Sequence, residues 1–340
     1  MAVTLRDIAD QSGVSMKTVS RVLNNEPNVS DATRERVEAA ATALGYRPNL
    51  AARGLASSRS FLIAMLYDDV SNSYVLSLME GATEVCRRAG YHLIVEPVKN
   101  DSLDTPASVS RLLRRLNVDG LILTPPLSDN TALIAALDLL DMPAVRLAPF
   151  DTAGRHPVVT IDNFGAAREV TEHLLAIGHT RISFIAGAPS HSATEARLAG
   201  YRDALDAAGI AADDALIADG DFTWRSGFNA TAELMGQTPT AIFASNDDMA
   251  AGALSWLGRN GYRVPEDVAV AGFDDTSLSR VVHPALTTVW QDVVQMGRLS
   301  AELLTERRTA HADHRFAHKL VVRASSAPSV SDPSGGPSHA

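Results

Sequence analysis

The segment VSMKTVSRVLNN near the start of the chain arranges polar side chains along one side of an expected helix. Lys17, Arg21 and Asn24 stand at positions i, i+4 and i+7, which share one helix face, and Met16 and Ser20 lie beside them. A helix fits the major groove of DNA, where Lys and Arg suit guanine O6 and N7 and Met contacts apolar base edges. The spacing favours DNA binding over its alternative, the solvated face of an ordinary helical bundle.

A second group of polar and aromatic side chains follows the ends of successive apolar runs. Because ligands bind beyond the carboxyl ends of parallel strands, we expect these side chains to converge on one rim. Carboxylates, an amide, a guanidinium group and aromatic rings together suit a hydroxyl-rich ligand, and sugars are the obvious fit. The group comprises Asp68, Asp69, Tyr74, Arg197, Asp221, Phe222, Trp224, Asn246, Asp247, Asp248, Asp274 and Asp275.

Three members of this group have plainer alternatives that the sequence leaves open. They are a helix cap for Asp247, a surface ion pair for Arg197 and a place in the core for Trp224. Each of these roles is common for its residue type, so the residues alone favour no single member of the group.

The sequence contains few signs of an enzyme active site, a cofactor site or a metal site. The chain contains no G-x-G-x-x-G, G-x-x-x-x-G-K-[ST], G-x-S-x-G or H-E-x-x-H motif. Neighbouring carboxylates such as Asp274 and Asp275 point apart on a strand end, which disfavours an acid–base pair. His311, His314 and His318 lie in a polar stretch without a cysteine, which is typical of a solvated segment. The sequence therefore predicts no enzyme, no cofactor and no metal site.

The elements that must position the first group are three short helices in the first 45 residues. Thr4, Ser15 and Ser30 stand where each helix would begin and are good N-cap residues. Gly13 and Gly45 end the first and third helices, because glycine reaches the left-handed conformation without strain. Two helices joined by a tight glycine turn make a helix-turn-helix.

From Phe61 onward, apolar runs alternate with amphipathic stretches, from FLIAMLY to HKLVVRAS. This alternation indicates a doubly wound, parallel α/β structure. About ten strands exceed one comfortable open sheet, so we expect two lobes. The preceding segment RPNLAARGLASSRS is short, and we expect it to be helical only when something supports it. The Ser/Pro/Gly-rich tail is expected to be disordered.

Charge and cysteine content agree with this division of the 340 residues. Residues 1–60 carry eight Lys or Arg and six Asp or Glu, whereas the whole chain has a net charge of −10. A basic head on an acidic body is typical of an anion-binding module on a solubilising body. Cys86, the single cysteine, is expected to be a buried helix residue. A chain with one cysteine forms no internal disulfide, which fits a reducing cytoplasm. We expect no secretory signal and no membrane helix.

The head segments TLRDIADQSGVSMKTVSRVLNN and VSDATRERVEAAATALGYRPNLAARGL resemble the lactose repressor/galactose repressor (LacI/GalR) family of bacterial transcription factors. The body resembles the same family, so the resemblance covers residues 3 to about 325. Its matching segments are IDNFGAAREVTEHLLAIGHTRISFIAG, RLAGYRDAL, PTAIFASNDDMAAGAL, VPEDVAVAGFDD and PALTTVWQ.

The resemblance implies specific DNA contacts. It places Ser15, Met16, Lys17, Thr18, Ser20 and Arg21 on the recognition helix. Met16 and Lys17 stand where family members vary to choose their operator. It makes Thr4, Asn24 and Tyr46 candidates for phosphate contacts. NLAARGL matches a hinge helix that, in the family, enters the minor groove and wedges a leucine between base pairs. The residue that matches this leucine is Leu55, and Ala52 and Arg53 lie close by.

The resemblance also favours some members of the second group as effector contacts. Arg197, Asn246 and Asp274 occupy motif positions where effector contacts recur, and Phe222 stands where an aromatic ring stacks on the ligand. With Asp69, Tyr74 and Trp224 they form the expected effector site. Two segments depart from the pattern of relatives, Asn72–Tyr74 and residues 145–151 (VRLAPFD), so the sequence names no particular sugar.

Together these observations predict a cytoplasmic repressor with a body like that of periplasmic binding proteins. It would bind a pseudo-palindromic operator as a homodimer and be released by a small carbohydrate. The alternatives are a purine or nucleoside corepressor and a sugar sensor that does not bind DNA. The expected parts are a DNA-binding domain at 1–47, a hinge helix and linker at 48–60, one lobe at 61–160 with 292–318, a second lobe at 161–291 with 319–326, and a tail at 327–340.

Overall fold

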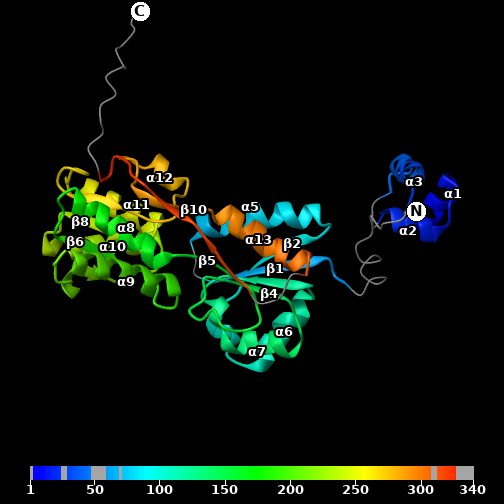
Figure 1. The fold of residues 1–340 in the computed structure, drawn as a ribbon, viewed down its shortest axis with the longest axis horizontal. Coiled ribbons are helices and arrows are strands. Elements are labelled where there is room, and N and C mark those ends of the chain that lie inside the picture. Colours follow the sequence, from blue (N-terminus) through cyan, green and yellow to red (C-terminus); the bar gives the residue numbers. More distant parts are fainter. Residues whose placement is uncertain (1–2, 24–28, 47–58, 69–70, 308–311, 327–340) are drawn as a thin grey trace, which may run out of the picture. The chain divides into compact units, whose positions relative to one another are not determined.

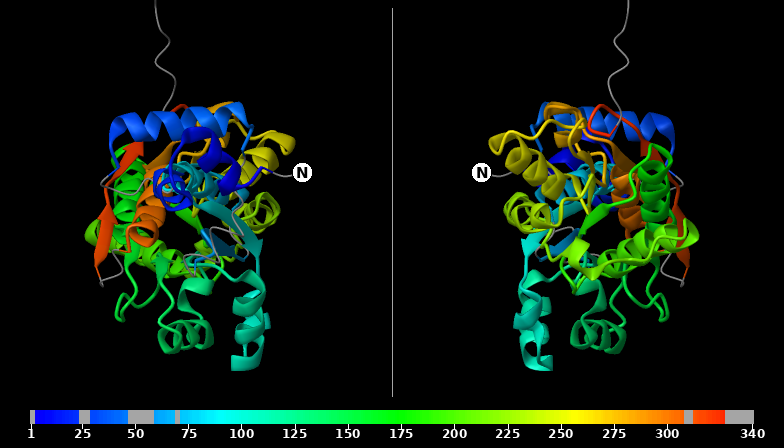
Figure 2. Two further views of the ribbon diagram at one scale, coloured as in Figure 1. Left: turned by 90° about the vertical axis from the view of Figure 1, so that its right-hand side faces the viewer. Right: turned by 90° about the vertical axis from the view of Figure 1, so that its left-hand side faces the viewer.

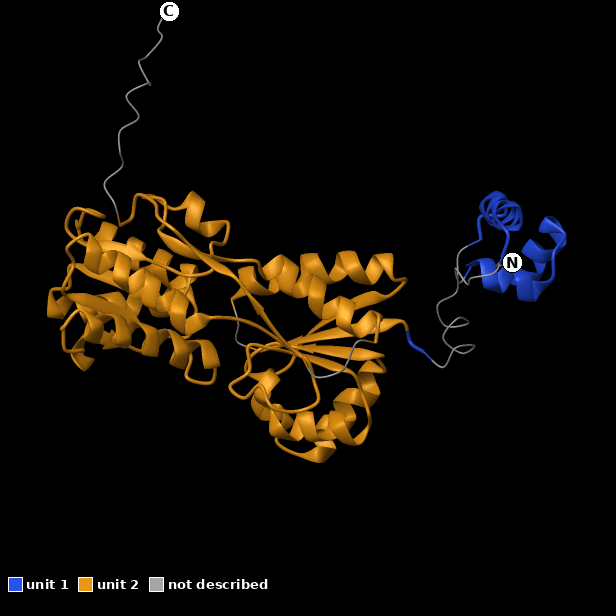
Figure 3. Ribbon diagram, in the orientation of Figure 1, with its two compact units in different colours: residues 1–60 blue, residues 61–340 orange. Residues whose placement is uncertain are grey.

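The computed structural model describes residues 3–23, 29–46, 59–68, 71–307 and 312–326. The chain forms two compact units, Met1–Ser60 and Phe61–Ala340, which are described separately below (Figure 3). The expected hinge helix at 48–60 and the tail at 327–340 lie almost entirely outside the described residues. No helix in the described ranges is long and apolar enough to cross a membrane.

The first unit contains the three expected helices, α1 (Leu5–Ser12), α2 (Met16–Leu23) and α3 (Asp31–Ala43). They pack around a small apolar core that includes Ile8, Val19, Val22 and Val37.

Local signals set the ends of these helices. The Thr4 hydroxyl accepts a hydrogen bond from the Asp7 amide, and the Asp7 carboxylate accepts one from the Thr4 amide, which forms a capping box. The Ser15 hydroxyl accepts a hydrogen bond from the Thr18 amide at 3.1 Å. Ser30 precedes α3 as expected, but its hydroxyl contacts the Thr33 hydroxyl at 2.9 Å and makes no side-chain cap.

The second unit begins with a six-stranded parallel sheet in the order β11-β5-β4-β3-β1-β2. The central strands β1 and β3 are continuous apolar runs because helices cover both faces, whereas β4 contains the buried Arg146. The strands are β1 (Leu62–Tyr67), β2 (His92–Pro97), β3 (Gly120–Leu123), β4 (Ala144–Leu147), β5 (Val158–Ile161) and β11 (Asp313–Phe316).

Two helix pairs sandwich this sheet. One face carries α5 (Asn72–Arg88) and α13 (Val293–Thr305), and the other carries α6 (Pro106–Leu116) and α7 (Thr131–Leu139) (Figures 1 and 2). Two short 3-10 helices, η1 (Asn100–Leu103) and η2 (Leu127–Asp129), lie in the connections. Cys86 on α5 is buried, as expected.

A second lobe repeats the plan around a four-stranded parallel sheet in the order β7-β6-β8-β9. Its strands are β6 (Ile182–Ile185), β7 (Ile217–Ala218), β8 (Ala241–Ala244) and β9 (Ala269–Ala271). One face packs against α8 (Asn163–Ala176) and α9 (Ser192–Ala207), and the other against α10 (Trp224–Leu234) and α11 (Asp247–Arg259). The smaller helices are α12 (Leu278–Val281), η3 (Asp214–Leu216) and η4 (Met235–Gln237).

Three segments connect the two lobes. The chain crosses from β5 to α8, from β10 (Thr288–Gln291) to α13, and from β11 to β12 (His318–Val321). Strands β10 and β12 pair with each other in an antiparallel ladder. The crossings lie at residues 161–163, 291–293 and 316–318.

Glycines allow paired helices to approach closely. A Cβ atom on Gly81 of α5 would lie 1.9 Å from the Val294 carbonyl oxygen of α13, and one on Gly297 would lie 2.2 Å from the Leu78 carbonyl oxygen. The pair α10 and α11 is alike, because a Cβ atom on Gly227 would lie 2.2 Å from the Met249 carbonyl oxygen. The helix backbones therefore touch directly.

We expect Gly81→Ala to destabilise the body by about 1–3 kcal/mol, because the added methyl group meets rigid backbone. Urea unfolding followed by fluorescence measures this, since all three tryptophans lie after residue 61. The matched control is Gly258→Ala on α11, where a Cβ atom meets nothing within 4 Å. Equal unfolding free energies for the two variants would contradict the packing argument.

Candidate DNA-binding surface and effector cavity

Helix α2 buries one side in the head and exposes another. Val19 and Val22 lie in the core, whereas Met16 is 54% exposed and Lys17 is exposed. Thr18, Ser20 and Arg21 lie half-buried between these two sides. The start of the helix therefore presents a thioether and an ammonium group to solvent, an arrangement suited to contacts with base edges.

The remaining expected DNA contacts fall into two sets. Thr4 is exposed, but its hydroxyl already contacts the Asp7 carboxylate at 2.8 Å. Tyr46 is half-buried against the head core. Four further candidates lie outside the described residues, Asn24, Ala52, Arg53 and Leu55.

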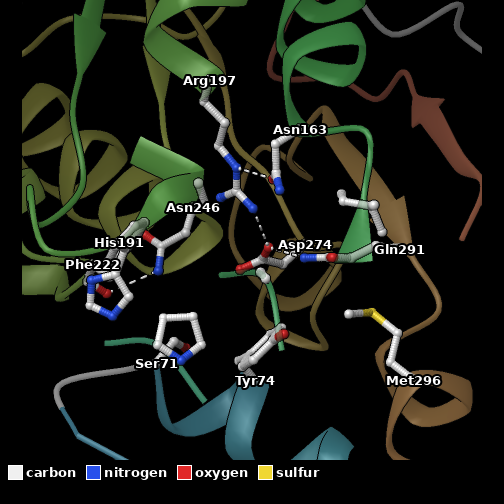
Figure 4. Close-up of a pocket in the computed structure, with 14 residues that line it drawn as sticks. Ser71, Tyr74, Asn163, His191, Arg197, Phe222, Asn246, Asp274, Gln291 and Met296 are labelled. Carbon is white, nitrogen blue, oxygen red and sulfur yellow. Dashed lines mark hydrogen bonds and ion pairs between the residues drawn. The ribbon is translucent and has the colours of Figure 1, made fainter. Parts of the chain in front are cut away.

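The body contains a cavity between its two lobes (Figure 4). The first lobe contributes mostly small and apolar groups to the wall, whereas the second contributes most of the polar ones. The wall consists of Ser71, Tyr74, Pro125, Ala148, Ile161, Asn163, His191, Ala193, Arg197, Phe222, Asn246, Asp274, Gln291 and Met296. The cavity lies beyond the carboxyl ends of both sheets, where ligands bind in open α/β structures.

Arg197, on α9, is the most heavily contacted polar residue of this wall. It is buried, and its Nε donates to Asn163 Oδ1 at 2.9 Å. Its Nη1 donates to the Ser245 carbonyl, its Nη2 lies 3.8 Å from Asp274 Oδ1, and its guanidinium carbon lies 3.5 Å from the centre of the Phe273 ring. Burial lowers the pKa of Arg197, and the Asp274 carboxylate opposes that shift.

Asp274 follows β9 and faces Arg197 across the cavity wall (Figure 4). Its φ angle of 107° is in a region that L-residues rarely adopt, and such strain is typical of functional positions. Gln291 Nε2 donates to Asp274 Oδ1 at 2.6 Å and holds the carboxylate in place. Burial raises the pKa of Asp274 to about 6, although Arg197 and the Gln291 hydrogen bond act in the opposite direction.

Asn246 and two rings complete the wall on the second lobe. Asn246 is the N-cap of α11, and its Nδ2 donates to the Phe222 carbonyl at 2.9 Å. The Phe222 ring meets the His191 ring edge-on, with centroids 5.1 Å apart. From the first lobe, the Tyr74 phenol faces the same space, and burial raises its pKa, which keeps it a hydrogen-bond donor.

One effector candidate expected from the sequence lies away from this wall, and another falls outside the described residues. Trp224 is the first residue of α10, is 38% exposed and stacks on Phe228 of the same helix with centroids 5.3 Å apart. Asp69 lies outside the described residues.

Asp247 is buried behind the wall rather than on it. Its carboxylate accepts hydrogen bonds from the Thr288 hydroxyl at 2.6 Å and the Thr276 amide at 2.7 Å. It is not the cap of α11, since Asn246 occupies that position.

Four polar residues of the wall escaped the sequence reasoning: Ser71, Asn163, His191 and Gln291. Asn163 and Gln291 lie on crossings between the lobes, directly after β5 and at the end of β10. The rule that ligands lie beyond strand ends would have found both, had it been applied to these two strands. Ser71 donates to the Asp248 carboxylate of the other lobe, a contact that no local pattern predicts.

Two family models match the chain. The model described as "Bacterial regulatory proteins, lacI family" matches residues 4–49, and the model described as "Periplasmic binding protein-like domain" matches residues 171–326. The regulator GalR of Escherichia coli is 35% identical over 347 residues, covering 99% of this chain and 98% of that protein. The regulator CelR of Thermobifida fusca is 36% identical over 322 residues, covering 90% of this chain and 92% of that protein.

Solved structures agree with these sequence matches. The lac repressor dimer bound to operator and the anti-inducer ONPF aligns with a TM-score of 0.77 and 31% identity, covering 96% of this chain and 99% of that one. A complex of the regulator CelR with cellobiose aligns with a TM-score of 0.69 and 33% identity, covering 95% of this chain and 99% of that one.

The raised pKa of Asp274 predicts a pH dependence of stability. Because the folded body binds this proton more tightly than the unfolded chain, the contribution of Asp274 to the free energy of unfolding should fall as pH rises from about 4 to about 6 and level off above. The full difference amounts to roughly 3 kcal/mol. Urea unfolding of wild type and Asp274→Asn across this range should give a shallower slope for the variant, whatever its absolute stability.

The matched control for this slope is Asp206→Asn, which removes an exposed carboxylate of α9. It should keep the wild-type pH dependence. Identical slopes for wild type and Asp274→Asn would overturn the assignment.

Proposed function

The chain belongs to the lacI family of bacterial regulatory proteins and is a DNA-binding regulator of transcription; from that premise we propose that it is a repressor controlled by a neutral, hydroxyl-rich effector, most simply a sugar. The effector would bind in the cavity between the lobes. We further propose that the repressor acts in the cytoplasm as a homodimer, so that two heads read the two halves of a pseudo-palindromic operator.

The observation that carries the effector class is the buried pair of Arg197 and Asp274 among amide groups. The two side chains have opposite charges, and all three guanidinium nitrogens of Arg197 already face protein oxygens. A phosphate or carboxylate ligand would therefore meet a neutralised guanidinium group. A sugar hydroxyl, in contrast, both donates to Asp274 and accepts from an amide, as the surroundings of this pair require.

Aromatic and apolar groups support the same class. Phe222 and Tyr74 offer ring surfaces to the C–H side of a sugar, and Ile161 and Met296 add apolar contact. The lining thus combines hydrogen-bonding side chains with apolar walls, as ligand sites for small polar molecules do.

Control of DNA binding then follows from the position of the cavity. A ligand held by both lobes favours the arrangement of lobes that it binds better, and it shifts the equilibrium only by that difference in affinity. We propose that this arrangement, passed on through the dimer, sets the spacing of the two heads and hence the affinity for the operator. In the simplest case, binding of the effector lowers the affinity for the operator, and the repressor leaves the DNA.

We expect a neutral sugar to raise the melting temperature of the protein in a thermal-shift screen. The screen compares mono- and disaccharides with sugar phosphates, purines and nucleosides. A ligand present at a concentration of 100 times its Kd adds about 2.7 kcal/mol to the free energy of unfolding. Asn246→Ala should lose the shift, because its amide lines the cavity, whereas the surface variant Arg168→Gln should keep it. Stabilisation by purines or sugar phosphates alone would refute the proposed effector class.

We expect the head to bind DNA from the upstream region of its own gene in a gel-shift assay, more tightly at low than at high salt. Arg21→Ala should weaken binding by about 1–3 kcal/mol, and Lys17→Ala should also relax sequence preference. Arg36→Ala removes the same charge from the exposed side of α3 and serves as the control. Failure to bind this region or neighbouring promoters at low salt would contradict the repressor function.

A further inference from the structure

Arg146 is a buried arginine that lies outside the cavity. Its guanidinium group is held by acceptors on two loops. It lies on β4 with 5% of its surface exposed, within the segment that departs from the family pattern. Its Nε donates to the Ser128 carbonyl at 2.7 Å, its Nη1 to the Ala153 carbonyl at 3.0 Å and its Nη2 to Asp129 Oδ1 at 3.2 Å. Each nitrogen of the guanidinium group thus has its own acceptor.

These acceptors belong to two separate loops that build the cavity wall. Ser128 and Asp129 belong to the connection that follows β3 and includes the wall residue Pro125. Ala153 belongs to the connection that follows β4 and includes the wall residue Ala148.

The Asp129 carboxylate strengthens the tie between these loops. Its Oδ1 also accepts a hydrogen bond from the Phe150 amide at 2.9 Å. One ion pair between a buried arginine and a partly buried carboxylate therefore holds both loops in a fixed arrangement.

The second of these loops makes a direct contact with the other lobe. The Ser192 hydroxyl donates to the Ala148 carbonyl at 2.6 Å. Ser192 is the first residue of α9, the helix that carries Arg197 into the cavity. Ala148 has a φ angle of 40°, which an alanine adopts only when its surroundings hold it there.

We propose that Arg146 is a positioning residue for closure of the cavity. By tying the two loops together, it presents the Ala148 carbonyl to Ser192 and so stabilises the closed arrangement of the lobes. The inference rests on the proposed function only in treating this cavity as the effector site. An arginine suits this role better than a lysine, since its planar fork serves three acceptors in fixed directions, whereas a lysine offers a point charge.

The test measures the distance between the lobes in the full-length protein without any sugar. Nitroxide labels on Leu139→Cys of α7 and Ala207→Cys of α9 lie on exposed sites of the two lobes, and buried Cys86 needs no replacement. Labelled protein is mixed with excess unlabelled protein, so that pulsed electron paramagnetic resonance reports distances within one chain. We expect one main distance in this background and an added, longer distance with Arg146→Met.

Three further variants make the result specific. Ser192→Ala should add the same longer distance, and Arg146→Met combined with Ser192→Ala should add no more than either change alone. Asp129→Asn should act in the same direction, and it keeps the test decisive if Arg146→Met fails to fold. Arg155→Met, which removes a half-exposed guanidinium group from the same connection, should leave the distances unchanged.

Two outcomes would overturn the proposal. One is a lower melting temperature for Arg146→Met and Asp129→Asn with an unchanged distance distribution, which would make the ion pair merely structural. The other is a double variant in which the longer distance is more populated than in either single variant. That result would mean that Arg146 does not act through the contact between Ser192 and Ala148. Neither outcome depends on the identity of the effector, so the thermal-shift screen tests the proposed function independently.

Discussion

The burial of the Arg197 guanidinium group imposes the strictest requirement on the body. A charge out of contact with water is tolerated only when other groups compensate for its lost hydration, and removing a partner from such a pair costs about 3–5 kcal/mol. Here the compensation comes from a carboxylate, an amide oxygen, a main-chain carbonyl and an aromatic ring. Those partners lie on different elements, so the position of one side chain fixes the mutual positions of α9, β9 and the start of α8.

The two amides in this network have a particular location. Asn163 and Gln291 lie where the chain crosses between the lobes, and each contacts one member of the charged pair. The polar centre of the cavity is therefore joined to two of the three connections about which the lobes would move. A ligand that competes for these hydrogen bonds alters the crossings as well as the cavity.

The sequence was a good guide wherever one strand or helix decides the outcome. Continuous apolar runs predicted the parallel strands, and the strand-end rule brought Arg197, Asn246 and Asp274 to one wall. It failed where the answer depends on contacts between side chains of separate segments. Ser71 contacts Asp248 of the other lobe, His191 meets the Phe222 ring of another loop, and Trp224 stacks on Phe228 instead of lining the cavity. A linear pattern contains the elements but not the rotation of one lobe against the other.

The glycine contacts between α5 and α13, and between α10 and α11, have a mechanical consequence. Helices that touch backbone to backbone have no side-chain layer that can yield, and protein interiors have low compressibility. Each lobe is thus a stiff block, whereas the lobes are joined by three thin crossings, two of which pair with each other through β10 and β12. A ligand that pulls on the cavity wall therefore deforms the inside of each lobe only slightly. Its main effect is a rotation of the two lobes about the crossings.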